Sequence, residues 1–572
     1  MNVINITNAS VNNLKNVSLT IPLNKYVAFV GRSGSGKSTL AEEVIMAGYI
    51  KQKPEVSVPV KPALFKQRSS GYTQKHTLYR YITGKEEQDG VSNVSLSEYL
   101  KKKENDLRLP PLELISIAKQ LELSSVEMNK YICDMSLCEY NKCRFMKLII
   151  NSDAELFIVD ELAAGLSHSE ALEVANVLKH LVSLGLSVIA VDHSIPLISS
   201  SDFIVELGPF AGESGGKIMF SGTTAKFKKT KSWETMNKAS NEKLNIELGS
   251  KKLLKIKNVN FHSFSKLDIT IPLDGVVSIC GGTGSGKSSI LDIIFRAYNK
   301  STNAWKNKTG IDGETIGKNY IRRPYIINQN LIGNNSMSTP ATYAGIMDGL
   351  RNIYLTSAQN QKAHFNLSDF SYNAAGKCPA CNGGGHTEIE IDEEKIQIPC
   401  PKCKGTRYNK RILTVKESGF SIGELLLLSC DHVHKLYSGE IKKKYIAEKI
   451  EFINEVGLSY LALGQPSTTL SGGESQRIKI TKELAKKLGD RCLFILDSPA
   501  KGLHVEDMAN VMRVLKKLVS KNNSVIIGEN HPFFIGNSDW IIYLKEGKIL
   551  YSGKPASLSK KYKDILGIGA IL

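Results

Sequence analysis

The chain carries one phosphate-loop pattern twice, and this repeat constrains its fold more than any other feature. The pattern G-x-x-x-x-G-K-S occurs from Gly31 to Ser38 and again from Gly281 to Ser288. Each copy follows a strand-like apolar run and precedes a helix-like segment, and in that context backbone N–H groups can close around phosphate oxygens. We therefore predict two phosphate-binding loops, each joining a strand to a helix.

Further blocks recur in the same order, so the repeat extends over both halves of the chain. The block "SVIAVDH" returns as "SVIIGEN", "ELGPFAGESGGKIMFSGT" is echoed by "YLKEGKILYSGK", and "LFIVD", ending at Asp160, returns as "LFILD", ending at Asp497. Matching blocks in one order indicate a tandem duplication. The basic stretch from Lys226 to Lys252 shows no helical or strand periodicity. We predict an α/β protein whose first half spans 1–228 and second half 253–572, joined by a linker at 229–252.

Length, charge and cysteine content limit the function classes. A chain of 572 residues exceeds what one core usually supports, so at least two domains are expected. The 74 Lys and Arg against 56 Asp and Glu favour a polyanionic partner such as nucleic acid, although a basic surface can also serve solubility alone. The polar start "MNVINITNASVNNL" and the lack of a membrane-length apolar run predict a cytoplasmic protein without membrane contact. In that compartment the 10 cysteines are not expected to form a disulfide framework.

The two loops predict ATP and Mg²⁺ as cofactors. Lys37 and Lys287 would reach the outer phosphates, while the serine after each lysine would hold Mg²⁺ with help from Asp160 or Asp497. The predicted cofactor-binding residues of the loops are Gly31, Ser33, Gly34, Gly36, Lys37, Ser38 and Thr39 in the first half, and Gly281, Thr283, Gly284, Gly286, Lys287, Ser288 and Ser289 in the second.

The segment "LSGGESQRIKI", from Leu470 to Ile480, resembles the signature of the ABC ATPases. In that family the signature lies at a helix N-terminus and caps the nucleotide held by the phosphate loop of the opposite half. The resemblance implies α/β nucleotide-binding domains of ABC type with helical signature subdomains. It also implies nucleotide contacts from Ser471, Gly472, Gly473 and Glu474.

Four longer segments narrow the resemblance to one family. "PATYAGIMDGLR", "FSYNAAGKCPACNGGGHTEIEI", "CPKCKGTRYN" and "LGQPSTTLSGGESQRIKITKEL" resemble UvrA, the damage-sensing excinuclease subunit, and with the first-half blocks the similarity covers nearly the whole chain. The resemblance implies ATP hydrolysis, binding to duplex DNA, a homodimer, and a role in the DNA damage response or in resistance to DNA-targeting compounds. It also implies that Gln67 and Gln329 sense Mg²⁺ and nucleotide.

A four-cysteine pattern predicts a zinc site in the second half. Cys378, Cys381, Cys400 and Cys403 form C-x2-C-x18-C-x2-C, which fits a tetrahedral four-thiolate site, with four free core thiols as the alternative. We place the zinc-bearing insertion at about 333–455, and in UvrA the matching module belongs to the DNA-handling surface. The basic residues around it are predicted to face outward to phosphates, or else to form a solvated face: Lys377, Lys402, Lys404, Arg407, Lys410 and Arg411.

The first half departs from the family pattern. Met135 lies only 68 positions after Gln67, and the segment between them has no cysteine pair. A short insertion at about 84–134 thus stands where UvrA carries its UvrB-docking and insertion domains, so docking of UvrB is not expected. The first signature reads "MSLCEYNKCRF", with Leu137 and Cys138 where glycines belong, and these side chains should hinder close approach to phosphate.

The departures fall on one of two composite sites if the halves pair head to tail, as in ABC ATPases. Site one combines the first loop, Asp160, Glu161 and His193 with the intact signature. Site two combines the second loop and Asp497 with Ser498, Asn530 and the degraded "MSLCE". We expect Glu161 to polarise the attacking water at site one, with His193 as the switch histidine and Gln67 assisting.

Site two is then expected to bind ATP and seldom cleave it. Two other functions remain open at this stage. One is a ribosome- or RNA-directed ABC ATPase, and the other is a regulatory scaffold whose nucleotide only stabilises a dimer.

Overall fold

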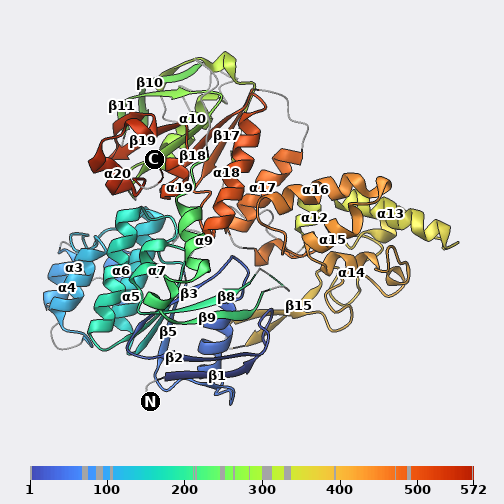
Figure 1. Ribbon diagram of the computed structural model, residues 1–572, viewed down its shortest axis with the longest axis horizontal. Helices are drawn as coiled ribbons and strands as arrows, with labels where there is room; N and C mark the ends of the chain where they lie inside the picture. The colour runs from blue at the N-terminus through green and yellow to red at the C-terminus, as the bar shows by residue number, and fades with distance from the viewer. Residues whose placement is uncertain are drawn as a thin grey trace. The chain divides into compact units, whose positions relative to one another are not determined.

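The structure is a computed structural model (Figure 1). The chain divides into two compact units. The core unit comprises Met1–Ile326 and Leu493–Leu572, and the inserted unit comprises Ile327–Cys492. The residues that the structure describes are 3–66, 75–85, 94–102, 107–209, 212, 215–244, 252–261, 264–282, 284–298, 312–327, 337–391, 394–470, 472–485, 491–569 and 571.

The first half of the core unit is built on a six-stranded sheet. Its central strands are almost wholly buried and rich in Val, Ile and Phe, as strands of a parallel sheet covered on both faces must be. Five strands run parallel and the last, at one edge, is antiparallel. In sheet order they are β5 (Pro62–Lys66), β6 (Leu156–Asp160), β7 (Ser187–Val191), β3 (Tyr26–Val30), β8 (Phe203–Gly208) and β9 (Lys217–Thr223).

The second half repeats this sheet with the same strand order. It runs β14 (Arg323–Ile327), β17 (Cys492–Asp497), β18 (Ser524–Gly528), β12 (Val276–Gly281), β19 (Trp540–Lys545) and β20 (Lys548–Gly553). A three-stranded antiparallel sheet accompanies each core: β2 (Val17–Pro22), β1 (Val3–Ala9) and β4 (Val56–Ser57), then β11 (Phe264–Pro272), β10 (Leu253–Phe261) and β13 (Asp312–Ile316). The predicted duplication and α/β fold class are confirmed.

Helices cover these sheets because each has one apolar face. In the first half, the buried faces of α4 (Pro111–Gln120), α5 (Leu137–Asn151) and α6 (His168–Ser183) pack into one hydrophobic cluster with the sheet. In Figure 1, α5, α6 and α7 (Ile195–Ser200) lie together beside the first-half strands. Among the described residues, the remaining α- and π-helices of the core unit are η1 (Thr39–Met46), α1 (Ala47–Ile50), α2 (Leu78–Thr83), α3 (Leu96–Lys102), α8 (Thr224–Phe227), α9 (Lys231–Ser240), α10 (Lys287–Tyr298), α18 (Val505–Val519), α19 (Pro532–Gly536) and α20 (Lys560–Leu566).

Part of the predicted linker between the halves is helical, although its sequence shows no helical periodicity. Helix α9 lies within it, with the Thr230 side chain accepting a hydrogen bond from the Trp233 backbone N–H. Met236 is buried, and α9 packs against α18 of the second half. The sequence pattern was too weak to show this helix because a single turn of apolar residues anchors it.

The inserted unit is mainly helical and carries a β-hairpin. The hairpin strands β15 (His386–Ile391) and β16 (Glu394–Pro399) are antiparallel. The helices are α12 (Pro340–Tyr343), α13 (Met347–Asn360), α14 (Ile422–Leu427), α15 (Cys430–Tyr437), α16 (Lys444–Glu455) and α17 (Gly472–Ala485). None of the helices in the described part of the chain has the length and apolar character needed to cross a membrane.

Candidate nucleotide and zinc sites

The first phosphate loop joins β3 to η1, as predicted. Its lysine folds back over the loop: Lys37 Nζ donates to the carbonyl oxygens of Gly31 at 2.9 Å and Arg32 at 2.8 Å. A side chain at Gly31 is excluded, since its φ is 135° and a Cβ would lie 2.1 Å from the Leu207 carbonyl oxygen. Burial lowers the pKa of Lys37 to about 8, although the negative charge of Glu161 opposes this shift. The loop therefore places a buried cation where phosphate is expected.

The second phosphate loop has the same geometry between β12 and α10. Lys287 Nζ donates to the Gly281 carbonyl oxygen at 2.8 Å and to that of Gly282 at 3.0 Å. The structure also brings together the predicted Mg²⁺ pair of this half, because Ser288 Oγ donates to Asp497 Oδ2 at 2.9 Å.

The carboxylate at the end of β6 fits a cation ligand. Asp160 is buried, and its Oδ1 receives no hydrogen bond from the residues that the structure describes. Burial, reinforced by the nearby charges of Glu161 and Glu42, raises the pKa of Asp160 to about 7. Clustered carboxylates with a buried oxygen unsatisfied form the kind of oxygen-rich site that Mg²⁺ prefers.

The residues after these strands occupy equivalent backbone positions in the two halves. Glu161 has φ 55° and its N–H donates to the Val191 carbonyl oxygen at 2.9 Å. Ser498 has φ 50° and its N–H donates to the Gly528 carbonyl oxygen at 2.8 Å. The two halves thus differ here in the side chain and not in the backbone. The Ser498 hydroxyl donates to Asp497 Oδ1 at 3.2 Å, within its own half.

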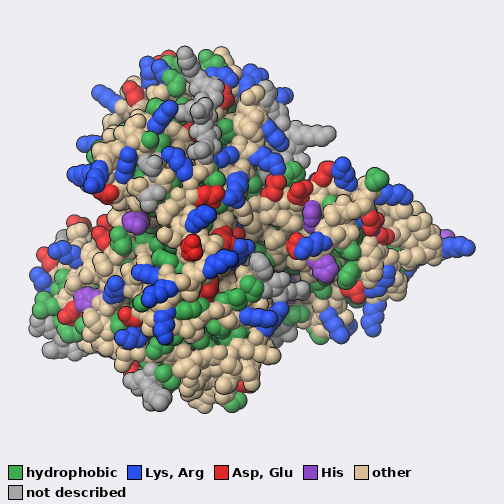
Figure 2. All heavy atoms as spheres, viewed as in Figure 1, with side chains coloured by type: hydrophobic (Ala, Val, Ile, Leu, Met, Phe, Trp, Pro, Cys, Tyr) green, Lys and Arg blue, Asp and Glu red, His purple; other side chains and the backbone are tan. Residues whose placement is uncertain are grey.

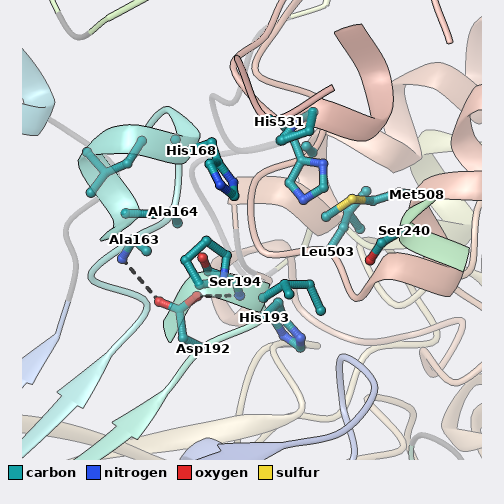
Figure 3. Close-up of a pocket in the computed structure, with 18 of the residues that line it drawn as sticks. Ala163, Ala164, His168, Asp192, His193, Ser194, Ser240, Leu503, Met508 and His531 are labelled. Carbon is teal, nitrogen blue, oxygen red and sulfur yellow. Dashed lines mark hydrogen bonds between the residues drawn. The ribbon is translucent and has the colours of Figure 1, made fainter. Parts of the chain in front are cut away.

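Two buried carboxylates that the sequence analysis did not single out fix the next elements. Asp192 accepts hydrogen bonds from the N–H groups of Ala163 at 3.1 Å and Ser194 at 2.8 Å (Figure 3). Glu529 does the same in the second half, accepting from the Ala500 N–H at 2.8 Å and from the two residues that follow it. In the repeated block each acid stands directly before the switch position. This shared position was the sequence signal that could have identified both acids. Burial raises the pKa of both carboxyls.

Asn530 stands at the position equivalent to His193, and it joins the two halves. Its Oδ1 accepts from the Gly281 N–H at 3.2 Å, in the phosphate loop of its own half. Its Nδ2 donates to the Gly165 carbonyl oxygen of the first half, also at 3.2 Å. His193 instead meets the ring of His504 edge-on, with 5.8 Å between ring centroids.

The first phosphate loop also touches the second half directly. Ser33 Oγ donates to the Gly502 carbonyl oxygen at 2.8 Å. Arg32 forms an ion pair with Glu506 at the start of α18. The first phosphate loop therefore contacts the second half directly within the core unit.

The degraded first signature begins helix α5 of the core unit, and its pairing with the second phosphate loop stays a prediction. Burial lowers the pKa of Lys287, and the negative charge of Glu170 opposes that shift. Cys138 lies in the first turn of α5, where Ser136 and Glu139 form a reciprocal capping box at 3.2 and 2.9 Å. Ser136 and Glu139 have counterparts in the intact signature, so the two signatures differ at Leu137 and Cys138, which stand where glycines allow close approach to phosphate.

The intact signature belongs to the inserted unit, where α17 begins at Gly472. Gly473 follows within the helix, and Glu474 accepts a hydrogen bond from the Tyr460 hydroxyl. Its approach to the first phosphate loop stays a prediction.

The four predicted zinc ligands lie together in the inserted unit. The Sγ atoms of Cys378, Cys381, Cys400 and Cys403 lie within 4.8 Å of one another. The Cys381 and Cys403 sulfurs are 3.7 Å apart, close to the roughly 3.8 Å edge of a tetrahedron with Zn–S bonds of about 2.3 Å. The Gly385 N–H donates to Cys381 Sγ at 3.3 Å, a contact typical of thiolate metal knuckles. The set fits a zinc ion.

Comparison with known proteins agrees with this geometry. Residues 14–164 match the family model described as ABC transporter, and residues 254–421 match one described as AAA domain. UvrABC system protein A of Helicobacter pylori is 35% identical over 419 residues, covering 71% of this chain and 44% of that protein. The Staphylococcus aureus protein of the same name is 30% identical over 491 residues, covering 83% and 51% respectively. The chain is a UvrA-like protein with two ABC-type domains.

Solved structures extend the likeness in fold. UvrA2 from Deinococcus radiodurans superimposes with a TM-score of 0.83 at 20% identity, covering 99% of each chain. A structure titled RNase-L Inhibitor gives 0.51 at 16% identity, covering 99% of this chain and 93% of that one. At these identities the matches establish the fold alone. The UvrA-like chain spans about half the length of the curated relatives it matches.

One residue of the basic set around the zinc ligands is not on the surface of the UvrA-like chain. Arg407 is 2% exposed, donates to the carbonyl oxygens of Gly464 at 2.9 Å and Gly383 at 3.3 Å, and lies over the Tyr372 ring. The prediction that it faces outward is wrong, because these buried carbonyls need a donor. The exposed members are Lys377, Lys402, Lys404, Lys410 and Arg411.

Lys and Arg side chains are spread over the face seen in Figure 2. Four predicted site residues of the UvrA-like chain lie outside the described residues: Gln67, Thr283, Gln329 and Ser471.

Proposed function

We propose that this UvrA-like chain binds ATP at two composite sites, hydrolyses it at one, and uses the cycle to change its grip on duplex DNA. The observation that carries the proposal is the difference between Glu161 and Ser498, which stand at equivalent positions of the two halves. Glu161 follows β6 and Ser498 follows β17, the equivalent strand of the other half. Both residues have a positive φ, and only Glu161 carries a carboxylate.

At site one, each group has a separate task. Lys37 would bind the outer phosphates through its ammonium group, and Ser38 with Asp160 would hold Mg²⁺, which when bound neutralises charge on the β- and γ-phosphate oxygens. The Glu161 carboxylate accepts a proton from the attacking water, whose oxygen bonds to the γ-phosphorus as the bond to the ADP oxygen breaks. His193, at the end of β7, would orient the γ-phosphate.

At site two, the same step lacks its base. The Ser498 hydroxyl has no acid–base capacity near neutral pH, and it already donates to its neighbour Asp497. Asn530 directs its amide donor to Gly165 of the first half. Lys287 and Ser288 remain in place, so nucleotide can bind there without being cleaved.

The DNA-binding part of the proposal rests on charge and on the zinc-type cluster. The exposed lysines beside the cysteines, Lys402 and Lys404 among them, can contact phosphates without reading sequence. The relatives are named for the UvrABC system, and we propose a role in the DNA damage response or in resistance to DNA-targeting compounds.

We propose that the two ATPase halves span 1–228 and 253–572 and that residues 229–252 connect them. The first half carries a short insertion at about 84–134, and the second half carries the zinc-bearing insertion at about 333–455. The protein would act in the cytoplasm as a homodimer without docking UvrB.

The deciding experiment compares Glu161→Gln with Ser498→Ala. The amide keeps the shape of the carboxylate but accepts no proton, so Glu161→Gln should lower ATP turnover about 10²-fold or more. Glu161→Gln should leave ATP binding intact. Ser498→Ala should keep ATP turnover within about twofold of the parent, because the serine hydroxyl has no acid–base role. Single-turnover hydrolysis with both sites filled should release phosphate from half of the bound ATP in the fast phase. Full activity in Glu161→Gln, or equal release from both sites, would overturn the assignment.

A second experiment on the same proteins tests the proposed DNA binding. Turnover should respond to duplex DNA more than to ribosomes or RNA, and DNA affinity should fall steeply as salt rises. A stronger response to ribosomes would transfer the proposal to an RNA-directed ATPase.

A further inference from the structure

The first phosphate loop carries an arginine that its repeat lacks. Arg32 stands in the first loop, and Gly282 occupies the equivalent position of the second. The two loops are otherwise alike in how the lysine folds back, because Lys37 and Lys287 each donate to two loop carbonyl oxygens. The arginine is therefore a feature of site one alone, and no step proposed for that site uses its side chain.

The Arg32 side chain reaches from the loop to the second half. It forms an ion pair with Glu506 in the first turn of α18. In the repeated block the position equivalent to Glu506 is Ser169, in the first turn of α6. Because neither Gly282 nor Ser169 carries a charge, the reciprocal ion pair cannot form at site two.

A second contact fixes the next residue of the first loop. Ser33 Oγ donates to the Gly502 carbonyl oxygen at 2.8 Å, four residues before Glu506. Two consecutive residues of the loop are thus held by one short segment of the second half. The backbone carbonyl oxygen of Arg32 also accepts from Lys37 Nζ at 2.8 Å. Movement of Arg32 would therefore move a carbonyl that holds the phosphate-binding lysine.

The charges around the ion pair agree with this placement. Burial lowers the pKa of His504 to about 3, and the positive charges of Lys37 and Arg32 add to that shift. Burial raises the pKa of Glu206, and the negative charge of Glu506 adds to that shift. The start of α18 therefore lies within electrostatic reach of the first phosphate loop.

We propose that Glu506 is a positioning residue for site one, which holds Arg32 across the boundary between the halves and so fixes the first phosphate loop in the shape that binds ATP. The inference rests on the proposed binding of ATP at this loop. A loop that is fixed before the nucleotide arrives loses less conformational freedom on binding, so its affinity is higher. Nucleotide binding at site one and contact between the halves are then linked, and each strengthens the other.

The sign of the effect separates positioning from charge. A carboxylate near the loop repels the triphosphate, so by charge alone its removal would strengthen ATP binding. The loss of positioning acts in the opposite direction and weakens binding. The Arg32 and Glu506 side chains are 40% and 26% exposed, and an ion pair of that exposure changes an affinity by about two- to fivefold.

The test measures equilibrium binding of a fluorescent ATP analogue to the full chain, together with ATP turnover. Glu506→Gln should weaken one of the two binding steps by about two- to fivefold and leave the other unchanged, because site two has no such ion pair. The KM for ATP should rise by the same factor, with kcat within about twofold. Glu234→Gln is the matched control and should behave as the parent, since Glu234 is an exposed glutamate in the first turn of α9.

A double-mutant cycle assigns the effect to the pair. In an Arg32→Gln background, Glu506→Gln should weaken nucleotide binding no further, because its partner is already gone. The inference would be overturned by ATP binding that is unchanged or tighter in Glu506→Gln, by equal weakening at both sites, or by losses that add in the double variant. A parent protein that binds ATP without cleaving it would refute the proposed hydrolysis, and the binding titration would still judge the pair.

Discussion

Arg407 offers a sharp test because its sequence context and its structural position point to different roles. Among the basic residues near the zinc-type cysteines it is the buried one, with hydrogen bonds to Gly464 and Gly383 and a ring contact to Tyr372. We expect Arg407→Met to destabilise the inserted unit and Lys402→Met, at an exposed position two residues after Cys400, to leave its stability unchanged.

The magnitude follows from the interactions that the Arg407 guanidinium makes. Each hydrogen bond from a charged donor contributes about 1.5–3 kcal/mol, and a partly desolvated cation–π contact adds about 1–2 kcal/mol. Burying the methionine side chain returns about 2 kcal/mol. The net loss in the free energy of unfolding is therefore about 2–6 kcal/mol for Arg407→Met, against less than about 0.5 kcal/mol for Lys402→Met.

The assay is urea unfolding of the full chain, with zinc release reporting on the inserted unit. Arg407→Met should lower the urea midpoint, while Lys402→Glu combined with Lys404→Glu should weaken DNA binding and reduce its salt dependence without moving that midpoint. The reasoning would be refuted by an Arg407→Met protein with parental stability and a DNA affinity reduced as much as in the lysine variants.

Three other predictions test the joint between the halves, the metal and the acid stability. Asn530→Ala should speed amide hydrogen exchange around Gly165, because that carbonyl loses its cross-half donor; unchanged exchange would contradict the contact. Purified protein should contain one zinc per chain by metal analysis, and Cys381→Ser should lose it and weaken DNA binding while ATP turnover stays within about twofold, since the metal stabilises its own module; a second zinc, or zinc retained in the variant, would count against the site. Burial raises the pKa of Glu424, but its hydrogen bonds, led by the one from Lys416, lower that pKa overall to about 2. The stability that Glu424 adds is thus present above pH about 4.3 and lost as pH falls toward 2, so the Tm difference between the parent and Glu424→Gln should shrink over that range, and a constant difference would refute it.

The features that the sequence predicted well depend on local chemistry. The apolar run ending at Asp160, the loop from Gly31 to Ser38 and the cysteine pairs each carry their geometry in the spacing of a few residues, and the repeat checks each reading against a second copy. The strand order of the sheets follows once the ABC resemblance is granted.

The features that sequence reasoning missed depend on contacts between distant segments. Arg407 reads as one more exposed cation because the carbonyl oxygens that need it belong to residues 383 and 464. Helix α9 reads as linker because its packing partner, α18, lies far along the chain. Asp192 and Glu529 were overlooked because a carboxylate whose oxygens are all used by backbone N–H groups has no sequence pattern of its own.

The changes at site two amount to more than missing parts, and this bears on how the two halves could move. Where His193 stands in the first half, Asn530 uses the acceptor end of its amide on Gly281 and directs the donor end to Gly165. In the first signature, Leu137 and Cys138 stand where Gly472 and Gly473 of the intact signature leave room for a phosphate. Asn530 thus replaces a histidine by an amide that bonds one half of the core unit to the other. This contact does not require ATP cleavage, so under the proposed function we expect site two to keep the halves together while hydrolysis at site one opens and closes its own side of the core unit.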